Sequence, residues 1–138
     1  MKTKAIHNIK AAEALIDKAE EGYYTASIHH VYYAVFQYMK YELAHTDMES
    51  LSYEEQTVKA KEDRVGSHDF IIKEIKRRIG RLANLDTAKD FARDVRELKG
   101  DRIDADYRSR QFTLEESLAC KRLAEELITK LKTYFGDL

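Results

Sequence analysis

Arg102 and Asp106 are the two residues whose positions most directly suggest chemistry. Apolar residues recur at helical spacing along one face of the segment 88–105, and they are Ala88, Phe91, Val95, Leu98 and Ala105. Arg102 falls on the same face, where a charge costs several kcal/mol unless it is paired. Asp106 lies one helical turn further on, so the two can form an ion pair. The pair either fixes this helix against a tyrosine-rich neighbour or belongs to a site at a dimer seam or groove, and the adjacent Tyr107 fits both interpretations.

Three histidines are further candidates. His29 and His30 are adjacent on a predicted helix, so their side chains point about 100° apart and cannot hold one metal ion together. We take His30 as the candidate of the two, and Tyr33, one helical turn further along, as a second candidate ligand-binding residue. The alternative is that His30 is an ordinary hydrogen-bonded histidine without a functional role. His68 stands at the predicted start of another helix, where it is either a first-turn residue or a phosphate ligand beside the helix N-terminus.

The metal-binding and catalytic motifs of common enzymes are missing. The element Glu42-Leu-Ala-His45 matches half of a di-iron site, but such a site needs a second copy, and the sequence holds one. The single cysteine, Cys120, rules out an internal disulfide and lies on an apolar stripe, which favours a place in the core. No phosphate-binding glycine loop or nucleophile elbow is present. We therefore predict no metal ion and no cofactor. An enzymatic function is the less favoured interpretation.

A tyrosine-rich helix must position these residues. Six of the nine tyrosines fall between residues 23 and 41, and apolar or aromatic residues occupy nearly every side of the helix predicted over 22–43. One stripe of that helix consists of Ile28, Tyr32, Val35, Met39 and Leu43. A helix that is apolar almost all round belongs in the middle of a bundle, so at least two neighbours must cover it.

The remaining segments predict an all-α, up-and-down bundle of about five helices. The other helices are expected over residues 4–21, from Ser67 to 82, from Asn84 or Asp86 to about 105, and from a Thr113 capping box to the C-terminus. Gly22 is expected to end the first helix, and Gly100 to mark the close approach of another backbone. Residues 45–64 are polar and show no clear hydrophobic period, which predicts a loop with at most one short helix. One helix face carries Lys73, Lys76, Arg77, Arg78 and Arg81, which indicates a solvated face or a surface for an anionic partner.

Size and composition point to one folded domain over residues 1–138. The charged fraction is 36%, the apolar fraction is 43%, and proline is absent, so nothing forces a helix to bend. The net charge of −1 lacks the basic excess typical of nucleic-acid binders, although a local basic face is compatible with it. No stretch of 18 apolar residues and no apolar leader is present, which predicts a cytoplasmic protein without a membrane span.

Two motifs of the chain, and the order in which they occur, resemble the HEPN superfamily of small helical bundles. The first is Gly22-Tyr23 with Ala26 and the run from Val31 to Phe36, and the second is Arg102-Ile-Asp-Ala-Asp106-Tyr107, with Ser67-His68 between them. The likeness is to a bacterial and archaeal branch with Tyr-Tyr-Ala-x-Phe and Arg-x-x-Ala-Asp-Tyr helices. It implies a HEPN-like four-helix core, a homodimer, and in many members a nucleotidyltransferase partner in a toxin–antitoxin pair.

The resemblance also implies a metal-independent ribonuclease in many members, but the chain departs from the motif on which that activity rests. The motif is an arginine followed, after four to six residues, by a histidine, whereas here only three residues separate Arg64 from His68 and no histidine follows Arg102. An aspartate at position 106 can accept a proton but cannot supply an imidazolium to a leaving oxygen. His30 stands where this branch usually has an arginine. We treat it as a hypothetical replacement for the missing catalytic histidine.

Three functions follow as expectations. The first is a non-catalytic or weakly active dimer that binds a nucleotide, an RNA end or a partner protein at Arg102, Asp106, Tyr107, Tyr33, His30 and His68. The second is an RNA endonuclease in which Arg102 stabilises the phosphate and His30 or Asp106 acts as acid or base. The third is a structural partner of a nucleotidyltransferase, without a ligand of its own.

Overall fold

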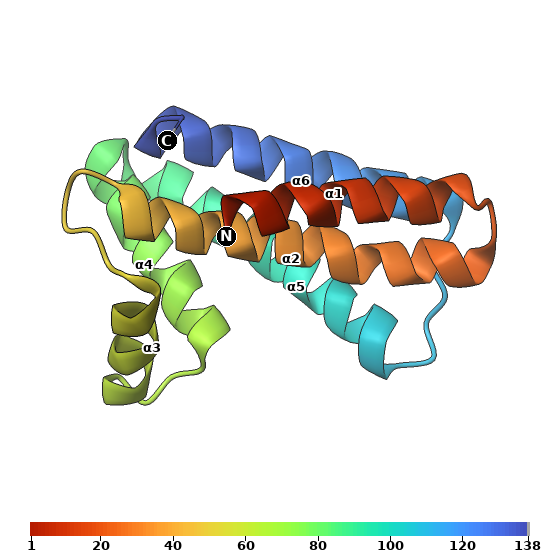
Figure 1. The fold of residues 1–138 in the computed structure, drawn as a ribbon, viewed down its shortest axis with the longest axis horizontal. Coiled ribbons are helices and arrows are strands. Elements are labelled where there is room, and N and C mark those ends of the chain that lie inside the picture. The colour runs from red at the N-terminus through yellow and green to blue at the C-terminus, as the bar shows by residue number, and fades with distance from the viewer. Residues whose placement is uncertain (138) are drawn as a thin grey trace.

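The protein folds into six helices, one of which lies at the centre of the others, as a computed structural model describes for residues 1–137 (Figure 1). The helices are α1 (Lys2–Asp17), α2 (Glu21–His45), α3 (Tyr53–Glu62), α4 (Ser67–Leu82), α5 (Leu85–Tyr107) and α6 (Leu114–Phe135). The helices α1, α2, α5 and α6 alternate in direction along the long axis, while α3 and the start of α4 extend from one side of α2 (Figure 1). The predicted all-α, up-and-down fold is confirmed.

The helix α2 is the centre of the bundle, because it packs against α1, α4, α5 and α6. The whole predicted stripe is fully buried, namely Ile28, Tyr32, Val35, Met39 and Leu43. Val31, Ala34, Phe36 and Tyr38 are also buried on other sides of the same helix. An apolar surface on nearly every side therefore makes α2 the element against which the others are ordered.

The first two helices meet differently from the prediction. The helix α1 ends at Asp17, and Ala19 adopts the left-handed conformation with φ of 56°, so it makes the turn that was expected at Gly22. Gly22 instead lies in the first turn of α2. The turn is short, and it sets α1 and α2 antiparallel as expected.

The segment predicted as a loop with at most one short helix contains a helix of ten residues, α3. Ser52 and Glu55 form a reciprocal capping box at its start, with Ser52 Oγ accepting from the Glu55 amide at 3.1 Å. The buried side chains of Gln56 and Ala60 attach this polar helix to the bundle. The short helix that the prediction allowed for is therefore present, and it is the sixth beside the five whose bounds were predicted, because a short, mostly polar helix has a weak hydrophobic period.

The caps predicted for the last two helices are present. The Asn84 side chain accepts from the Thr87 amide at 2.8 Å at the start of α5. Thr113 and Glu116 form the expected capping box at the start of α6, with N–H···O distances of 3.1 and 3.2 Å. Each cap satisfies amides that the first helical turn would otherwise leave unpaired.

Gly100 does not mark a close approach of another backbone, contrary to the sequence-based expectation. A Cβ added there would meet nothing within 4 Å. We expect Gly100→Ala to raise the free energy of unfolding by about 0.5–1 kcal/mol, because alanine loses less backbone entropy in an exposed helix interior. Urea denaturation of both proteins measures this difference, and an unchanged or lower midpoint would show that position 100 has a contact.

Candidate functional site

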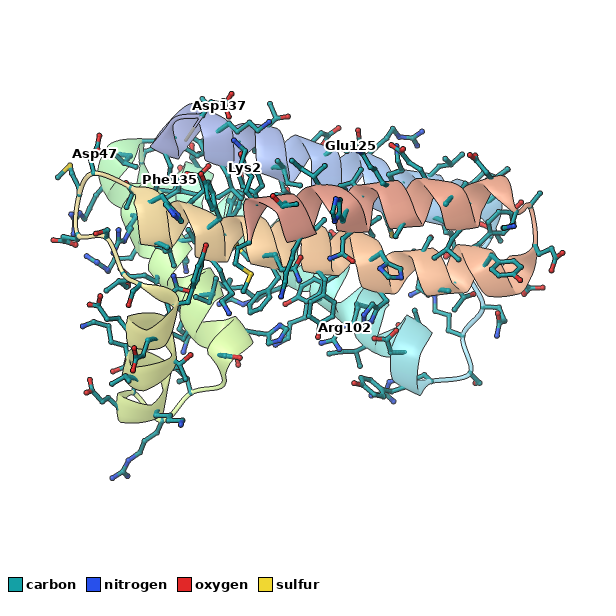
Figure 2. The ribbon with its side chains drawn as sticks, in the orientation of Figure 1. Lys2, Asp47, Arg102, Glu125, Phe135 and Asp137 are labelled. Carbon is teal, nitrogen blue, oxygen red and sulfur yellow. The ribbon has the colours of Figure 1, made fainter. Side chains whose placement is uncertain are left out.

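The guanidinium of Arg102 lies at the centre of a cluster built from α2, α4 and α5. The Arg102 cluster, as we call it, consists of His29, Tyr32, Tyr33, His68, Arg102, Asp106 and Tyr107. Figure 2 shows Arg102 on the side of α2 from which the start of α4 and the end of α5 extend. The three helices carry residues that are more than 30 positions apart in the sequence, so tertiary packing creates the cluster.

Three tyrosine rings surround Arg102. Its guanidinium carbon lies 5.2 Å from the ring centroid of Tyr32, 5.4 Å from that of Tyr33 and 5.8 Å from that of Tyr107. Arginine over an aromatic face is attracted by the ring quadrupole, more strongly where water is excluded. Only 7% of Arg102 is exposed. The α5 stripe thus places a cation against the tyrosines of α2, as the first of the two interpretations of Arg102 requires.

The predicted ion pair is present and is joined by a histidine. Arg102 Nη1 lies 3.7 Å from Asp106 Oδ2, and the same oxygen is 2.8 Å from His29 Nδ1. The Arg102 distance exceeds the 2.7–2.9 Å or so of a charge-assisted hydrogen bond, so Asp106 pairs with the guanidinium only loosely. Within residues 1–137, the buried Nε of Arg102 has no hydrogen-bond partner. The guanidinium therefore keeps unused hydrogen-bonding capacity.

His68 joins the cluster through Tyr32. The Tyr32 hydroxyl and His68 Nδ1 are 2.6 Å apart, and the imidazole stacks on the Phe36 ring with centroids 4.0 Å apart. Burial and the nearby Arg102 lower the pKa of His68 to about 4, while burial raises the pKa of Tyr32 above its usual value. The Tyr32 hydroxyl therefore donates to a neutral His68 at pH 7. His68 can offer a ligand its other ring nitrogen, but not a positive charge.

His30 is directed toward α1 rather than to the Arg102–Asp106 pair. Its Nδ1 is 2.7 Å from Asn8 Oδ1, and the Asn8 amide donates to Gln37 Oε1 at 2.8 Å. Burial, followed by the neighbouring His29, lowers the pKa of His30. Among the sequence candidates, Arg102, Asp106, Tyr107, Tyr33 and His68 come together, whereas His30 makes its hydrogen bond outside the cluster.

Sequence reasoning missed His29 and Tyr32. His29 and Tyr33 have ring centroids 4.7 Å apart, and Tyr32 contacts both His68 and Arg102. A signal existed for His29, because residues 29, 33 and 36 are spaced four and three apart and so share one helix face. Tyr32 was recognised as a core residue, but its hydroxyl partner could not be identified without the tertiary structure.

The end of α5 is held in place by the loop that follows it. Arg110 pairs with Asp101, Asp104 and Glu116 at distances of 3.1, 3.1 and 2.8 Å. The buried amide of Phe112 donates to Thr25 Oγ1 at 2.9 Å, which ties the loop to α2. Tyr107 is nevertheless 75% exposed. The cluster thus combines a fixed guanidinium with an aromatic ring that is open to solvent.

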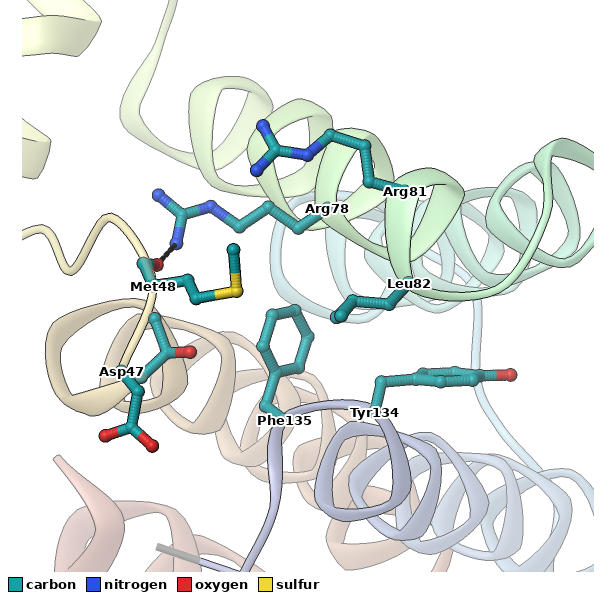
Figure 3. A pocket seen from close by; sticks show the side chains of 8 residues that line it. Asp47, Met48, Arg78, Arg81, Leu82, Tyr134 and Phe135 are labelled. Carbon is teal, nitrogen blue, oxygen red and sulfur yellow. Dashed lines mark hydrogen bonds between the residues drawn. The ribbon is translucent and has the colours of Figure 1, made fainter.

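A hollow at the end of the bundle lies away from the Arg102 cluster. A cavity of about 340 Å³ is bounded by the loop after α2 and the ends of α4 and α6, with Met48, Leu82 and Phe135 around it (Figure 3). Its buried Arg78 donates to the carbonyls of Met48 and Glu49 at 2.9 and 2.6 Å. Arg78 therefore holds the loop, and the expectation that it lies on a solvated face was wrong.

Other kinds of site find little support in residues 1–137. No three His, Cys, Asp or Glu side chains in this range are grouped to hold a metal ion, and none of its helices is long and apolar enough to cross a membrane. Cys120 is buried as predicted, and burial raises the pKa of its thiol to about 12. Its thiol is therefore protonated and unreactive at neutral pH.

Comparison with known proteins gives one match. A family model described as HEPN domain matches residues 1–134. No curated protein matches the chain. No solved structure matches it either.

Proposed function

The chain belongs to the HEPN domain family, and from this premise we propose that it is a module that binds the phosphorylated end of an RNA strand at the Arg102 cluster. The single observation that carries the proposal is a guanidinium held by three tyrosines whose only acidic partner, among residues 1–137, is the loosely placed Asp106. Binding without rapid cleavage fits a chain that lacks the arginine–histidine spacing of ribonucleases.

Asp106 stands where the phosphate would bind. Its Oδ2 lies 2.8 Å from His29 Nδ1 and 3.7 Å from Arg102 Nη1, so one oxygen is shared between an imidazole and a guanidinium. A phosphate oxygen can take the same place, because guanidinium recognises both anions through the same donors. The Asp106 side chain is 20% exposed, so it can turn toward solvent when a phosphate replaces it.

Tyr107 supplies a surface for the base next to that phosphate. The ring is 75% exposed and its centroid lies 5.8 Å from the Arg102 guanidinium carbon. Stacking of a base on an aromatic ring contributes about 1–3 kcal/mol and tolerates any sequence. The expected ligand is therefore a terminal nucleotide recognised by charge and stacking, with little base specificity.

Fluorescence anisotropy with a short RNA, phosphorylated at its 5′ end and labelled at its 3′ end, tests the proposal. We expect Arg102→Met to weaken binding at least about tenfold, because it removes the donors and keeps most of the side-chain volume. Asp106→Asn should tighten binding about fivefold, since it removes a negative charge from the phosphate position. Asp90→Asn, which removes an exposed carboxylate elsewhere on α5, is the matched control.

Each alternative function predicts a different outcome of the same experiment. Equal affinities for wild type, Arg102→Met and Asp106→Asn contradict the site. Cleavage of the RNA in EDTA that disappears in Arg102→Met supports an endonuclease, and adding His29→Ala and His30→Ala identifies its histidine. Absence of binding in every variant leaves a structural partner of a nucleotidyltransferase. The homodimer implied by the family resemblance stays a prediction.

A further inference from the structure

A second cationic surface lies between α4 and α5, away from the Arg102 guanidinium. A shallow hollow of about 580 Å³ is lined there by Lys73, Lys76, Arg77, Gly80, Leu85 and Arg96, which together form what we call the α4–α5 seam. Four of these six residues are basic and none is acidic. The sequence suggested a basic face on one helix alone, whereas the seam also takes in Arg96 from the next helix.

Three of the seam cations have no acidic partner. Within residues 1–137, neither Lys73, Lys76 nor Arg96 forms an ion pair within 4.0 Å. Lys76 and Arg96 also have no Asp or Glu three or four positions away, so their own helices cannot neutralise them. Asp69, the carboxylate one turn before Lys73, pairs with Lys99 at 3.2 Å instead. The positive charge of the seam is therefore left for an external anion.

The neighbouring arginines of α4 differ from these three. Arg77 pairs with Glu74 and Glu49, and Arg81 with Glu49, at 2.6 to 3.5 Å. These pairs hold the guanidinium groups of Arg77 and Arg81 at Glu49, in the loop after α2, although Arg77 also lines the seam. Ion pairing thus divides the basic residues of α4 into a structural group and a group available for binding.

The packing of α4 against α5 brings like charges together. The helices are antiparallel, with Asp69 paired to Lys99 at one end and the Gly80 position close to Ala88 at the other. This packing places Lys73 opposite Arg96 across the seam. Both side chains line the same hollow. Cations facing each other repel unless an anion lies between them. A binding site for a chain of negative charges explains this arrangement.

We propose that the α4–α5 seam binds the phosphodiester backbone of the RNA whose end is held at the Arg102 cluster; the inference rests on the proposed function. Arg96 and Arg102 are six residues apart on α5, about 9 Å along the helix axis and about 120° apart around it, so a strand that curves around α5 can reach both. The seam has no aromatic residue and one exposed apolar side chain, Leu85. Protein partners require buried aromatic or apolar anchors, whereas backbone phosphates require cations alone.

The test is the salt dependence of binding of a single-stranded RNA, measured by fluorescence anisotropy. Each neutralised phosphate contributes about −0.7 to the slope of log K against log salt concentration. The triple variant Lys73→Gln, Lys76→Gln, Arg96→Gln should therefore have a slope shallower by about 2. Lys130→Gln, which removes an exposed lysine of α6, should leave the slope unchanged.

The outcomes separate this inference from the proposed function. A slope unchanged in the triple variant, with binding still weakened by Arg102→Met, overturns the seam alone. A shallower slope without any effect of Arg102→Met retains the seam and overturns the end-binding site, and absence of binding overturns both. Displacement of the RNA by poly-glutamate of equal charge at equal concentration would show that the seam accepts acidic polypeptides equally, which overturns its assignment to nucleic acid.

Discussion

Arg102→Ala is expected to lower the free energy of unfolding by about 3 kcal/mol. Arg102 is 7% exposed, lies over three tyrosine rings and pairs with Asp106. Truncation removes these attractions and leaves a void among the rings, a combination that costs several kcal/mol in other buried sites. Urea denaturation followed by far-UV circular dichroism measures the loss.

Two comparisons make the Arg102 result specific. Arg93→Ala removes an arginine from the same helix whose side chain is 67% exposed, so it should change the free energy of unfolding by less than about 0.5 kcal/mol. Arg102→Met should recover part of the loss, because its side chain fills most of the space among the tyrosines. A truncation at position 102 as mild as that at position 93 would mean that the rings hold together without the guanidinium.

Glu42→Gln is expected to raise the free energy of unfolding above pH 7 by about 2 kcal/mol. Glu42 is fully buried in α2, and neither carboxylate oxygen has a hydrogen-bond partner within residues 1–137. Burial, partly offset by Lys2, raises the pKa of Glu42 to about 7 from an ordinary value of 4.5. The folded protein therefore holds a proton that the unfolded chain releases at lower pH.

The sign of the pH dependence follows from that shift. Below pH 4.5 both states are protonated and Glu42 contributes nothing. As the pH rises from 4.5 to 7, the unfolded state ionises first, so the wild-type protein loses up to about 3 kcal/mol, and the loss is complete above pH 7.

Denaturation midpoints at a series of pH values from 4.5 to 8 check the expectation. The glutamine variant should lack this part of the pH dependence, while Glu126→Gln, an exposed substitution on α6, should keep it. Parallel curves for wild type and Glu42→Gln would show that the carboxylate is ionised in the folded protein and finds a partner.

Local rules determined most of the fold. The stripe from Ile28 to Leu43 identified the central helix, and the caps at Asn84 and Thr113 marked where α5 and α6 begin. These signals depend on residues at most four positions apart, so the chain itself carries them. Local signals were less precise in two places. The mostly polar α3 was allowed for only as a short helix without bounds, and a left-handed Ala19 makes the turn that glycine was expected to make.

The sequence by itself also determined that Arg102 and Asp106 form a pair, because one helical turn separates them and a buried charge requires a partner. Only the tertiary structure decided which other groups surround the pair. His29 rather than His30 reaches Asp106, Tyr32 joins His68 to the cluster, and Arg96 completes the seam. Each of these contacts joins different helices, and their geometry depends on how α2, α4 and α5 pack, which no spacing within a single helix encodes.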